Sequence, residues 1–455
     1  MKFITHSTIS GTVAAPASKS MMGRAVAAAL LADGISVIRN PSSCDDAQTA
    51  LDIIRALGAV MSEGEKVAIR GTGKRLLYPQ KGSLDCRESG LCMRMFTPIA
   101  ALLDREVALY ASGSLRSRPM GMVEELETLG VACRTDRGYA PIIVRGPMKG
   151  GHITVDASVS SQLLTGLLMA LPLCETDSHI AVTGLKSTPY VRMTLSLLKG
   201  FGVAITHDEG LTEFVVKGGQ EYRPATYTVE GDWSGAAFLL VAGALAGSVT
   251  VTGLDLASPQ ADRAIIEVLE MAGASIKTGR GSVTVENRSL KSFRFDATDC
   301  PDLFPPLVAL ASGCVGKSEI KGLERLAHKE SDRAKALSSE FGKLGIAIQQ
   351  HGGTMEVRGG AVRKAEVDAH NDHRIAMACA VAALRAEGDV GIAGETCVAK
   401  SYPTFFVDLE TLGVRQSRPI RIQRYDPQAG APGDEEEAHP LRGYPDEVNK
   451  GGIRV

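Results

Sequence analysis

The chain has 455 residues, of which 44% are hydrophobic and 22% are charged, and its formal net charge is -2. A single hydrophobic core stops growing near about 250–300 residues, so this length predicts more than one domain. The near-neutral charge and an aromatic content of 5% argue against a protein that binds nucleic acid or an anionic membrane through a broad basic surface. Recognition of an anion would therefore have to come from local clusters.

The segment 16–24 (PASKSMMGR) is the first that points to such a cluster. It is rich in small and hydroxyl residues, and it places Lys19 and Arg24 directly before an apolar run at 25–32 that predicts a helix. Free backbone N–H groups and the helix dipole at a helix start favour a bound anion. Taken alone, the segment is equally compatible with an ordinary N-cap followed by two solvated cations.

One α/β unit is repeated six times along the chain. In each copy an amphipathic helix pattern ends in an apolar residue, a glycine and an aliphatic or small residue, and successive glycines lie 68 to 72 residues apart. Glycine at such a position predicts a helix C-cap with positive φ. The six glycines are Gly58, Gly130, Gly202, Gly273, Gly345 and Gly413.

A second, more apolar helix is predicted upstream of each of these. The six segments are 25–32, 95–103, 163–172, 235–246, 306–312 and 375–385. Because these helices are apolar on all sides, we expect them inside the protein, with the sheets outside. Six equal units predict three units in each of two domains.

We expect one domain at 16–228, with repeats 1–3, and another formed by 1–15 and 229–416, with repeats 4–6. The N-terminal strand is expected to pair with the second half, and 226–230 is expected to be a strand that enters that half. Residues 417–455 are charged and rich in proline and glycine, which predicts a poorly ordered tail.

Three features predict a cytoplasmic protein. Met1–His6 do not open the apolar core of a signal peptide, and the nine cysteines contain no C-x-x-C pair, which is typical of reduced thiols. The apolar run at 236–246 is shorter than the roughly 20 residues of a membrane-spanning helix.

Several predicted helices begin with polar or cationic clusters. Alone, Ser160, Ser161 and Asp302 are compatible with N-caps, and Glu330 and Arg333 with an i,i+3 surface pair. The helix dipole, however, disfavours cations at a helix start. A cleft that binds a ligand with several negative charges accounts for the cations better. They are Lys19, Arg24, Arg118, Lys329, Arg333, Arg374 and Lys400.

Over residues 1–416 the sequence resembles the EPSP synthase (3-phosphoshikimate 1-carboxyvinyltransferase) family of enolpyruvyl transferases. The resemblance is carried by P-A-S-K-S-x-x-x-R at 16–24, S-V-S-S-Q at 158–162, E-G-D-W-S at 230–234, K-E-S-D-R at 329–333, N-D-H-R at 371–374 and A-K-S-Y-P at 399–403. It implies an α/β fold, a two-domain inside-out α/β barrel with three repeated units per domain, helices inside and sheets outside.

The resemblance also implies a reaction. The enolpyruvyl group of phosphoenolpyruvate would pass to the 5-hydroxyl of shikimate 3-phosphate, giving 5-enolpyruvylshikimate 3-phosphate and phosphate on the pathway to chorismate and aromatic amino acids. No metal or organic cofactor is implied. The partners would be these two small molecules, and we expect a monomer that binds neither nucleic acid nor membrane.

By the resemblance, the catalytic residues are Lys19, Asp302 and Glu330. Asp302 would accept the proton of the 5-hydroxyl, and Glu330 would help to protonate the methylene carbon, with Lys19 as an alternative donor. The residues implied for shikimate 3-phosphate are Lys19, Ser20, Arg24, Ser160, Ser161, Gln162, Tyr190, Asp302 and Lys329. Those implied for phosphoenolpyruvate are Lys19, Gly90, Arg118, Gln162, Arg333, Arg374 and Lys400.

Two positions depart from the family pattern. Glu88 opens the segment 88–94 (ESGLCMR), where the family often has an N-x-G-T-x-M-R loop, and Arg325 replaces an asparagine that some members have. One alternative is UDP-N-acetylglucosamine enolpyruvyltransferase, but its catalytic cysteine would fall at Gly113. Another is a non-catalytic phosphometabolite-binding protein on the same scaffold.

Overall fold

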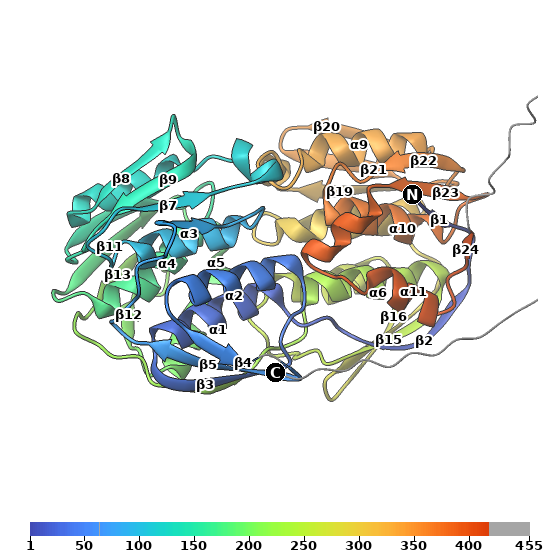
Figure 1. Ribbon diagram of the computed structural model, residues 1–455. Coiled ribbons are helices and arrows are strands. Elements are labelled where there is room, and N and C mark those ends of the chain that lie inside the picture. The colour runs from blue at the N-terminus through green and yellow to red at the C-terminus, as the bar shows by residue number, and fades with distance from the viewer. Residues whose placement is uncertain (63, 418–455) are drawn as a thin grey trace, which may run out of the picture. The chain divides into compact units, whose positions relative to one another are not determined.

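The computed structural model describes residues 1–62 and 64–417, so the tail predicted at 417–455 lies almost wholly outside the described residues. Six helices carry the buried interior, as the all-round apolar segments predict, and their side chains are buried along almost their whole length. They are α1 (Lys19–Leu31), α3 (Gly90–Ala100), α4 (Gln162–Ala170), α6 (Trp233–Ala246), α8 (Phe304–Ser312) and α10 (His373–Ala383) (Figure 1).

A second, amphipathic helix follows in each unit. These are α2 (Asp45–Ala56), η2 (Gly121–Leu129), α5 (Thr188–Gly200), α7 (Ile265–Met271), α9 (Arg333–Lys343) and α11 (Phe405–Thr411). The second of them, η2, is a 3-10 helix rather than an α-helix. The glycines that follow all have positive φ, from 76° at Gly130 to 104° at Gly58, which confirms the predicted C-caps.

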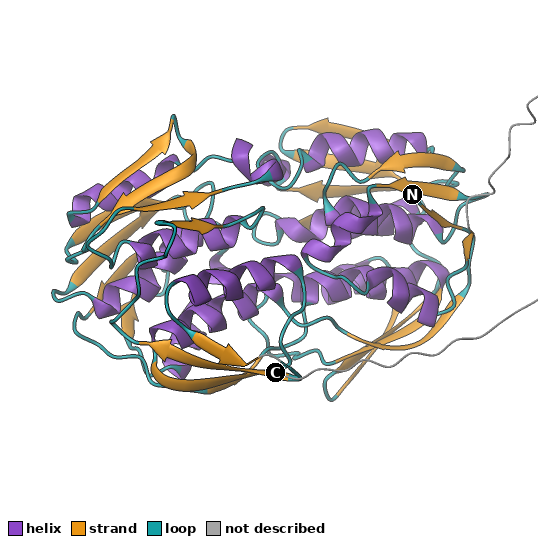
Figure 2. Cartoon of the chain, in the orientation of Figure 1, coloured by secondary structure: helices purple, strands orange, loops and turns teal. Residues whose placement is uncertain are grey.

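The strands form six four-stranded sheets, and in Figure 2 the sheets lie outside the inner helices. Each sheet combines one parallel strand pair with antiparallel pairs. Three sheets belong to the first half of the chain: β14 (Thr226–Thr228)-β3 (Asp33–Arg39)-β5 (Lys66–Thr72)-β4 (Val60–Ser62), β6 (Ser83–Asp85)-β7 (Val107–Tyr110)-β9 (Tyr139–Arg145)-β8 (Ala132–Asp136), and β10 (His152–Asp156)-β11 (Ser178–Thr183)-β13 (Glu213–Val216)-β12 (Ile205–His207).

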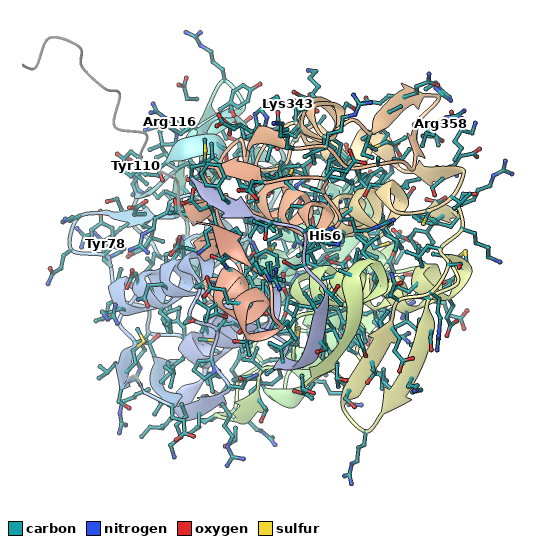
Figure 3. The ribbon with its side chains drawn as sticks, turned by 90° about the vertical axis from the view of Figure 1, so that its right-hand side faces the viewer. His6, Tyr78, Tyr110, Arg116, Lys343 and Arg358 are labelled. Carbon is teal, nitrogen blue, oxygen red and sulfur yellow. The ribbon has the colours of Figure 1, made fainter. Side chains whose placement is uncertain are left out.

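The other three sheets combine the second half with the N-terminus. They are β16 (Ser275–Gly279)-β17 (Ser282–Glu286)-β15 (Gly247–Thr252)-β2 (Ile9–Ala14), β18 (Arg294–Asp296)-β19 (Lys317–Lys321)-β21 (Thr354–Arg358)-β20 (Ala347–His351), and β22 (Ala365–Asp368)-β23 (Val390–Ala393)-β1 (Lys2–Ile4)-β24 (Gln416–Ser417). Figure 3 views this part of the molecule from its end, with His6 marking the connection between β1 and β2.

One sequence prediction about the strands is wrong. Strand β14 does not enter the second half, because it pairs in parallel with β3, with Thr226 opposite Val37. It therefore completes a sheet of the first half. The edge of β3 is open to a fourth strand at this point, and the backbone N–H of Val37 donates to Ala225 at 2.9 Å.

Buried apolar residues form two separate clusters. One contains α1, α3 and α4, and the other contains α6, α8 and α10 together with Ile4, Ile9 and Val13 from the N-terminal strands. The exact domain boundaries at 15/16 and 228/229 stay a prediction. Among the described residues, no helix is both long and apolar enough to cross a lipid bilayer.

Candidate active site

A cavity of about 370 Å³ is lined by the first turns of α1, α3 and α4 and by loops at the starts of α5, α8, α9 and α10. Its walls therefore come from both apolar clusters. The structure brings most of the predicted site residues together here. Those that line the cavity are Lys19, Ser20, Arg24, Gly90, Arg118, Ser160, Ser161, Gln162, Tyr190, Asp302, Lys329, Glu330 and Arg374.

The start of α1 is an N-cap with a charged side chain beside it. The Ser18 hydroxyl accepts from the backbone N–H of Met21 at 3.5 Å, and Lys19 Nζ donates to Asp46 Oδ2 at 2.9 Å. Burial works against the lysine charge, but the carboxylates of Asp46 and Glu330 outweigh it and raise the pKa of Lys19. Lys19 therefore carries a proton at neutral pH.

Two buried arginines beside the cavity have only neutral hydrogen-bond partners. Arg24 is 1% exposed and donates to the Ser20 carbonyl and to the hydroxyls of Thr165 and Thr194. Arg94 is 5% exposed and donates to Gln162 Oε1 at 2.8 Å and to the Pro119 carbonyl at 2.9 Å.

Neither arginine forms an ion pair with a carboxylate of the described residues, and the Nε atom of Arg94 has no hydrogen-bond partner there. Burial lowers the pKa of Arg24 to about 10, and burial together with the charge of Arg118 lowers that of Arg94 to about 9. A bound anion would supply the missing negative charge.

The acids at the opposite wall are surrounded by cations. Asp302 accepts from Arg333 Nη1 at 2.7 Å and from Arg374 Nη2 at 3.1 Å, and lies 3.5 Å from Lys329 Nζ. Glu330 accepts from Arg333 Nη2 at 2.6 Å. Burial favours the neutral acids, but the surrounding positive charges hold the pKa of both carboxyls well below their ordinary values. Both are ionised at neutral pH.

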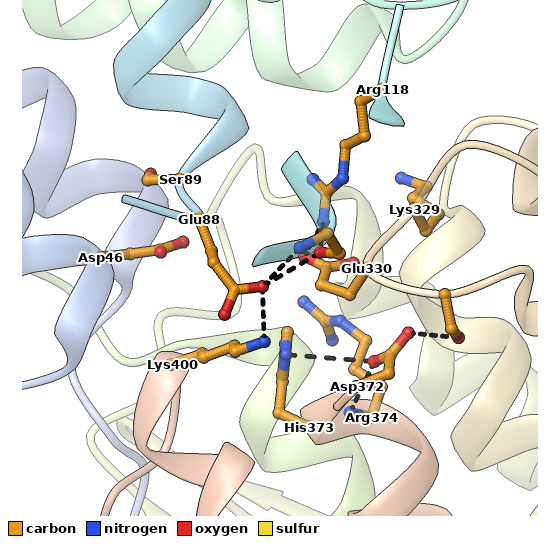
Figure 4. A network of polar contacts seen from close by, with 12 residues as sticks. Asp46, Glu88, Ser89, Arg118, Lys329, Glu330, Asp372, His373, Arg374 and Lys400 are labelled. Carbon is orange, nitrogen blue, oxygen red and sulfur yellow. Dashed lines mark hydrogen bonds and ion pairs between the residues drawn. The ribbon is translucent and has the colours of Figure 1, made fainter. Parts of the chain in front are cut away.

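Two predicted residues, Arg333 and Lys400, do not line the cavity. Arg333 lies behind its wall and donates to Asp302, to Glu330 and, through Nε at 2.8 Å, to Asp372. Lys400 donates to Glu88 Oε2 at 3.0 Å and to the Asn371 carbonyl at 2.7 Å. Figure 4 shows Lys400 turned toward Glu88 and away from Lys329.

Sequence reasoning missed several residues that line the cavity, among them Arg94, Ser187 and Arg325. Arg325 Nη1 donates to the Ser158 carbonyl at 2.7 Å, and Nη2 donates to Ser187 Oγ at 2.9 Å, so it connects the two halves of the chain. Arg94 stands in a segment that the sequence already singled out. A basic residue on a buried helix with no acid three or four positions away was the signal that could have found it.

A family model described as EPSP synthase (3-phosphoshikimate 1-carboxyvinyltransferase) matches residues 4–409. Relatives named 3-phosphoshikimate 1-carboxyvinyltransferase include that of Methanocorpusculum labreanum, 39% identical over 415 residues (90% of this chain, 98% of the relative). The one from Halobacterium salinarum is 40% identical over 425 residues, covering 90% of this chain and 98% of the relative.

Solved structures give the same picture of the fold. The EPSP synthase of Acinetobacter baumannii superposes with a TM-score of 0.77 at 24% identity, covering 92% of this chain and 99% of that one. The enolpyruvyl transferase NikO from Streptomyces tendae superposes with a TM-score of 0.72 at 19% identity, covering 91% and 98%. The predicted α/β fold with helices inside and sheets outside is confirmed.

Proposed function

This chain belongs to the EPSP synthase family, and we infer that it transfers the enolpyruvyl group of phosphoenolpyruvate to the 5-hydroxyl of shikimate 3-phosphate. The products are 5-enolpyruvylshikimate 3-phosphate and phosphate. The chain is thus a transferase of the shikimate pathway. No observation favours the UDP-N-acetylglucosamine reaction or a non-catalytic binding protein.

The observation that carries this proposal is the pair of buried arginines without carboxylate partners. An uncompensated buried charge costs several kcal/mol, and charge-assisted bidentate contacts from a phosphate or carboxylate offset that cost. Each of the two substrates carries one phosphate and one carboxylate. A cavity with Arg24 and Arg94 at one wall and Arg374 and Lys329 at another suits two such ligands side by side.

The division of residues between the substrates follows the family motifs. Shikimate 3-phosphate is assigned to the wall formed by the starts of α1, α4 and α5, with Lys329 and Asp302 facing it. Phosphoenolpyruvate is assigned to the wall near Gly90 and Arg118. Arg333 and Lys400 take part only if they exchange a protein carboxylate for the ligand, since their donors are occupied by protein groups here.

The protonation states suggest the order of proton transfers. Lys19 holds a proton, whereas Glu330 and Asp302 are ionised, so Lys19 is the group that can protonate the methylene carbon first. Carbon 2 then becomes cationic, the 5-hydroxyl oxygen attacks it, and Asp302 takes the hydroxyl proton. The tetrahedral intermediate loses phosphate and one methyl proton, which restores the double bond.

The two bound substrates also change the pKa of Asp302 and Glu330. Their negative charge opposes that of Asp302 and Glu330 and so raises the pKa of both carboxyls, which the surrounding cations hold well below their ordinary values. Asp302 thereby becomes a stronger base, and Glu330 becomes able to share a proton with Lys19. Substrates that fill the cavity keep water from competing with the hydroxyl as the nucleophile.

We also propose that the enzyme acts in the cytoplasm as a monomer on small-molecule substrates. All nine cysteines are buried free thiols, which is typical of a reducing compartment.

Phosphate release tests the proposed reaction directly. The purified protein should release phosphate from phosphoenolpyruvate only when shikimate 3-phosphate is also present, without added metal. Release that requires UDP-N-acetylglucosamine instead would assign the chain to the other reaction. A folded protein that releases no phosphate with either acceptor would contradict both assignments and leave a binding protein.

A further inference from the structure

Glu88 is a half-buried carboxylate that has no role in the proposed reaction. It lies in the connection between β6 and α3, and it accepts hydrogen bonds from two distant stretches of the chain. The backbone N–H and the hydroxyl of Ser114 donate to Oε2 at 3.1 Å each. Two further donors come from the second half of the chain. Asn371 Nδ2 donates at 3.2 Å, and Lys400 Nζ donates at 3.0 Å (Figure 4).

The backbone turn before Glu88 orients its side chain. Arg87 has a positive φ of 46°, and its backbone N–H donates to Asp85 Oδ1 at 2.9 Å, so the chain turns sharply just before Glu88. The other side of the carboxylate is fitted against Gly113, where an added Cβ would stand 2.3 Å from Glu88 Cδ. Glu88 therefore occupies the space that a side chain at position 113 would need.

The contact with Glu88 occupies part of the hydrogen-bonding capacity of Lys400. An ammonium group has three donors, and Lys400 uses two of them on Glu88 and on the Asn371 carbonyl. Its side chain is 10% exposed and does not line the cavity. Burial works to raise the pKa of Glu88, but its contacts with Lys400, Ser114 and Asn371 outweigh burial and lower it, so the carboxylate stays charged at neutral pH.

The same network reaches the cavity wall. Ser114 Oγ, which donates to Glu88, also accepts from Arg118 Nη2 at 3.3 Å, and Arg118 lines the cavity. Arg118 lies 3.7 Å from Glu330. A change at Glu88 is therefore transmitted both to Lys400 and to a cation at the wall assigned to phosphoenolpyruvate.

We propose that Glu88 is a positioning residue that sets the affinity for phosphoenolpyruvate by holding Lys400 as its own counter-ion until the ligand displaces it. This inference rests on the proposed function. A carboxylate at this place competes with the ligand for Lys400 and repels its negative charge. Enzymes in which an amide stands at this position lack that competitor.

The test replaces Glu88 by neutral residues that keep hydrogen-bonding groups. Glu88→Gln should lower KM for phosphoenolpyruvate by about tenfold, the scale of one partly exposed charge contact, with KM for shikimate 3-phosphate and kcat little changed. Glu88→Asn, which restores the amide common in the family loop, should act in the same direction. Glu106→Gln removes one negative charge from an exposed pair with Arg134 and serves as the control without effect.

A double-mutant cycle shows whether Glu88 acts through Lys400. In a Lys400→Gln background, Glu88→Gln should no longer improve KM for phosphoenolpyruvate. An unchanged or raised KM in both neutral variants would overturn the proposal. So would the same improvement in the Lys400→Gln background, because Lys400 would then not be the group that Glu88 holds.

A binding measurement separates this inference from the proposed reaction. Phosphoenolpyruvate alone should raise the melting temperature of Glu88→Gln more than that of the unsubstituted enzyme, at equal ligand concentration. That result would stand even if no turnover were seen with shikimate 3-phosphate. Suppose instead that phosphoenolpyruvate raises both melting temperatures equally and that the enzyme turns over. Glu88 would then have no effect on the affinity for phosphoenolpyruvate, and the assigned reaction would still stand.

Discussion

Single buried charges decide what this cavity can hold. Arg24 and Arg94 are placed by helices whose other side chains pack into the apolar interior, and each has only neutral partners. Asp46, on the same side of the cavity, is paired with Lys19, and Asp302 and Glu330 at the other wall are paired with Arg333 and Arg374. This separation of charge leaves one wall of the cavity with a surplus of positive charge that only a ligand can satisfy.

The unpaired charge of Arg24 lowers the stability of the folded protein but binds an anionic substrate. The variant Arg24→Met tests both effects. Because the methionine removes an unpaired buried charge, we expect the melting temperature to stay the same or rise. The affinity for shikimate 3-phosphate should fall at least about 100-fold, the effect of losing a buried charged partner. Arg70→Met, at an exposed position on β5, should change neither quantity. Normal binding of shikimate 3-phosphate by Arg24→Met would contradict the assignment of Arg24.

The raised pKa of the Asp262 carboxyl predicts that the stability of the protein depends on pH. It is buried, accepts from the Ser234 hydroxyl and has an unpartnered Oδ1. Burial, and next the charge of Asp302, raise the pKa of Asp262 from 3.8 to about 7. Its stabilising contribution is full below pH 3.8, where both the folded and unfolded states are protonated, and is lost as pH rises through 7.

Asp262→Asn should therefore melt a few degrees higher than the unsubstituted protein at pH 8, and the difference should shrink toward pH 4. Asp296→Asn gives the control of opposite sign. Contacts with Thr298 and Lys321 lower the pKa of the exposed Asp296, so this variant should be slightly less stable at pH 8. If the difference in melting temperature between Asp262→Asn and the unsubstituted protein does not vary with pH, the pKa of Asp262 is not raised.

At the scale of elements, the sequence predicts the inner helices but not where they begin. The apolar run predicts α1 from residue 25, whereas the helix starts at Lys19 because the Ser18 side chain caps it. The same holds for α3, which is capped by Ser89, and for α6, which is capped by Asp232. Hydrophobic periodicity follows the buried turns, whereas the side chains of Ser18, Ser89 and Asp232 that set the helix starts lie just before them and carry no such pattern.

The fit between Glu88 and Gly113 gives a prediction about the connection after β7. Both Gly113 and Gly130 have positive φ, but an added Cβ would clash with Glu88 at Gly113 and would meet nothing within 4 Å at Gly130. Gly113→Ala should lower the melting temperature more than Gly130→Ala, because the backbone strain of about 1 kcal/mol is shared while the clash adds about 1–3 kcal/mol. Equal losses would mean that Glu88 moves aside freely.

For the whole molecule, the six repeats were enough to predict three units in each of two domains, and the all-round apolar helices were enough to predict helices inside and sheets outside. The contacts between the halves were not predictable in this way. Glu88 and Lys400 are 312 positions apart, and Arg325 reaches Ser158 across 167 positions. No periodicity encodes such pairs, and family motifs name site residues without showing which protein groups hold them.

The proposed reaction requires that the methylene carbon of phosphoenolpyruvate, bound beside shikimate 3-phosphate, gains a proton and later loses one. Proton NMR of the product formed in D₂O at high enzyme concentration tests it most directly. Protonation of the methylene carbon creates a methyl group, so the vinyl positions of the product should contain deuterium once the double bond is restored. A product whose vinyl positions hold only the original protons, or pyruvate formed in its place, would contradict the proposed reaction.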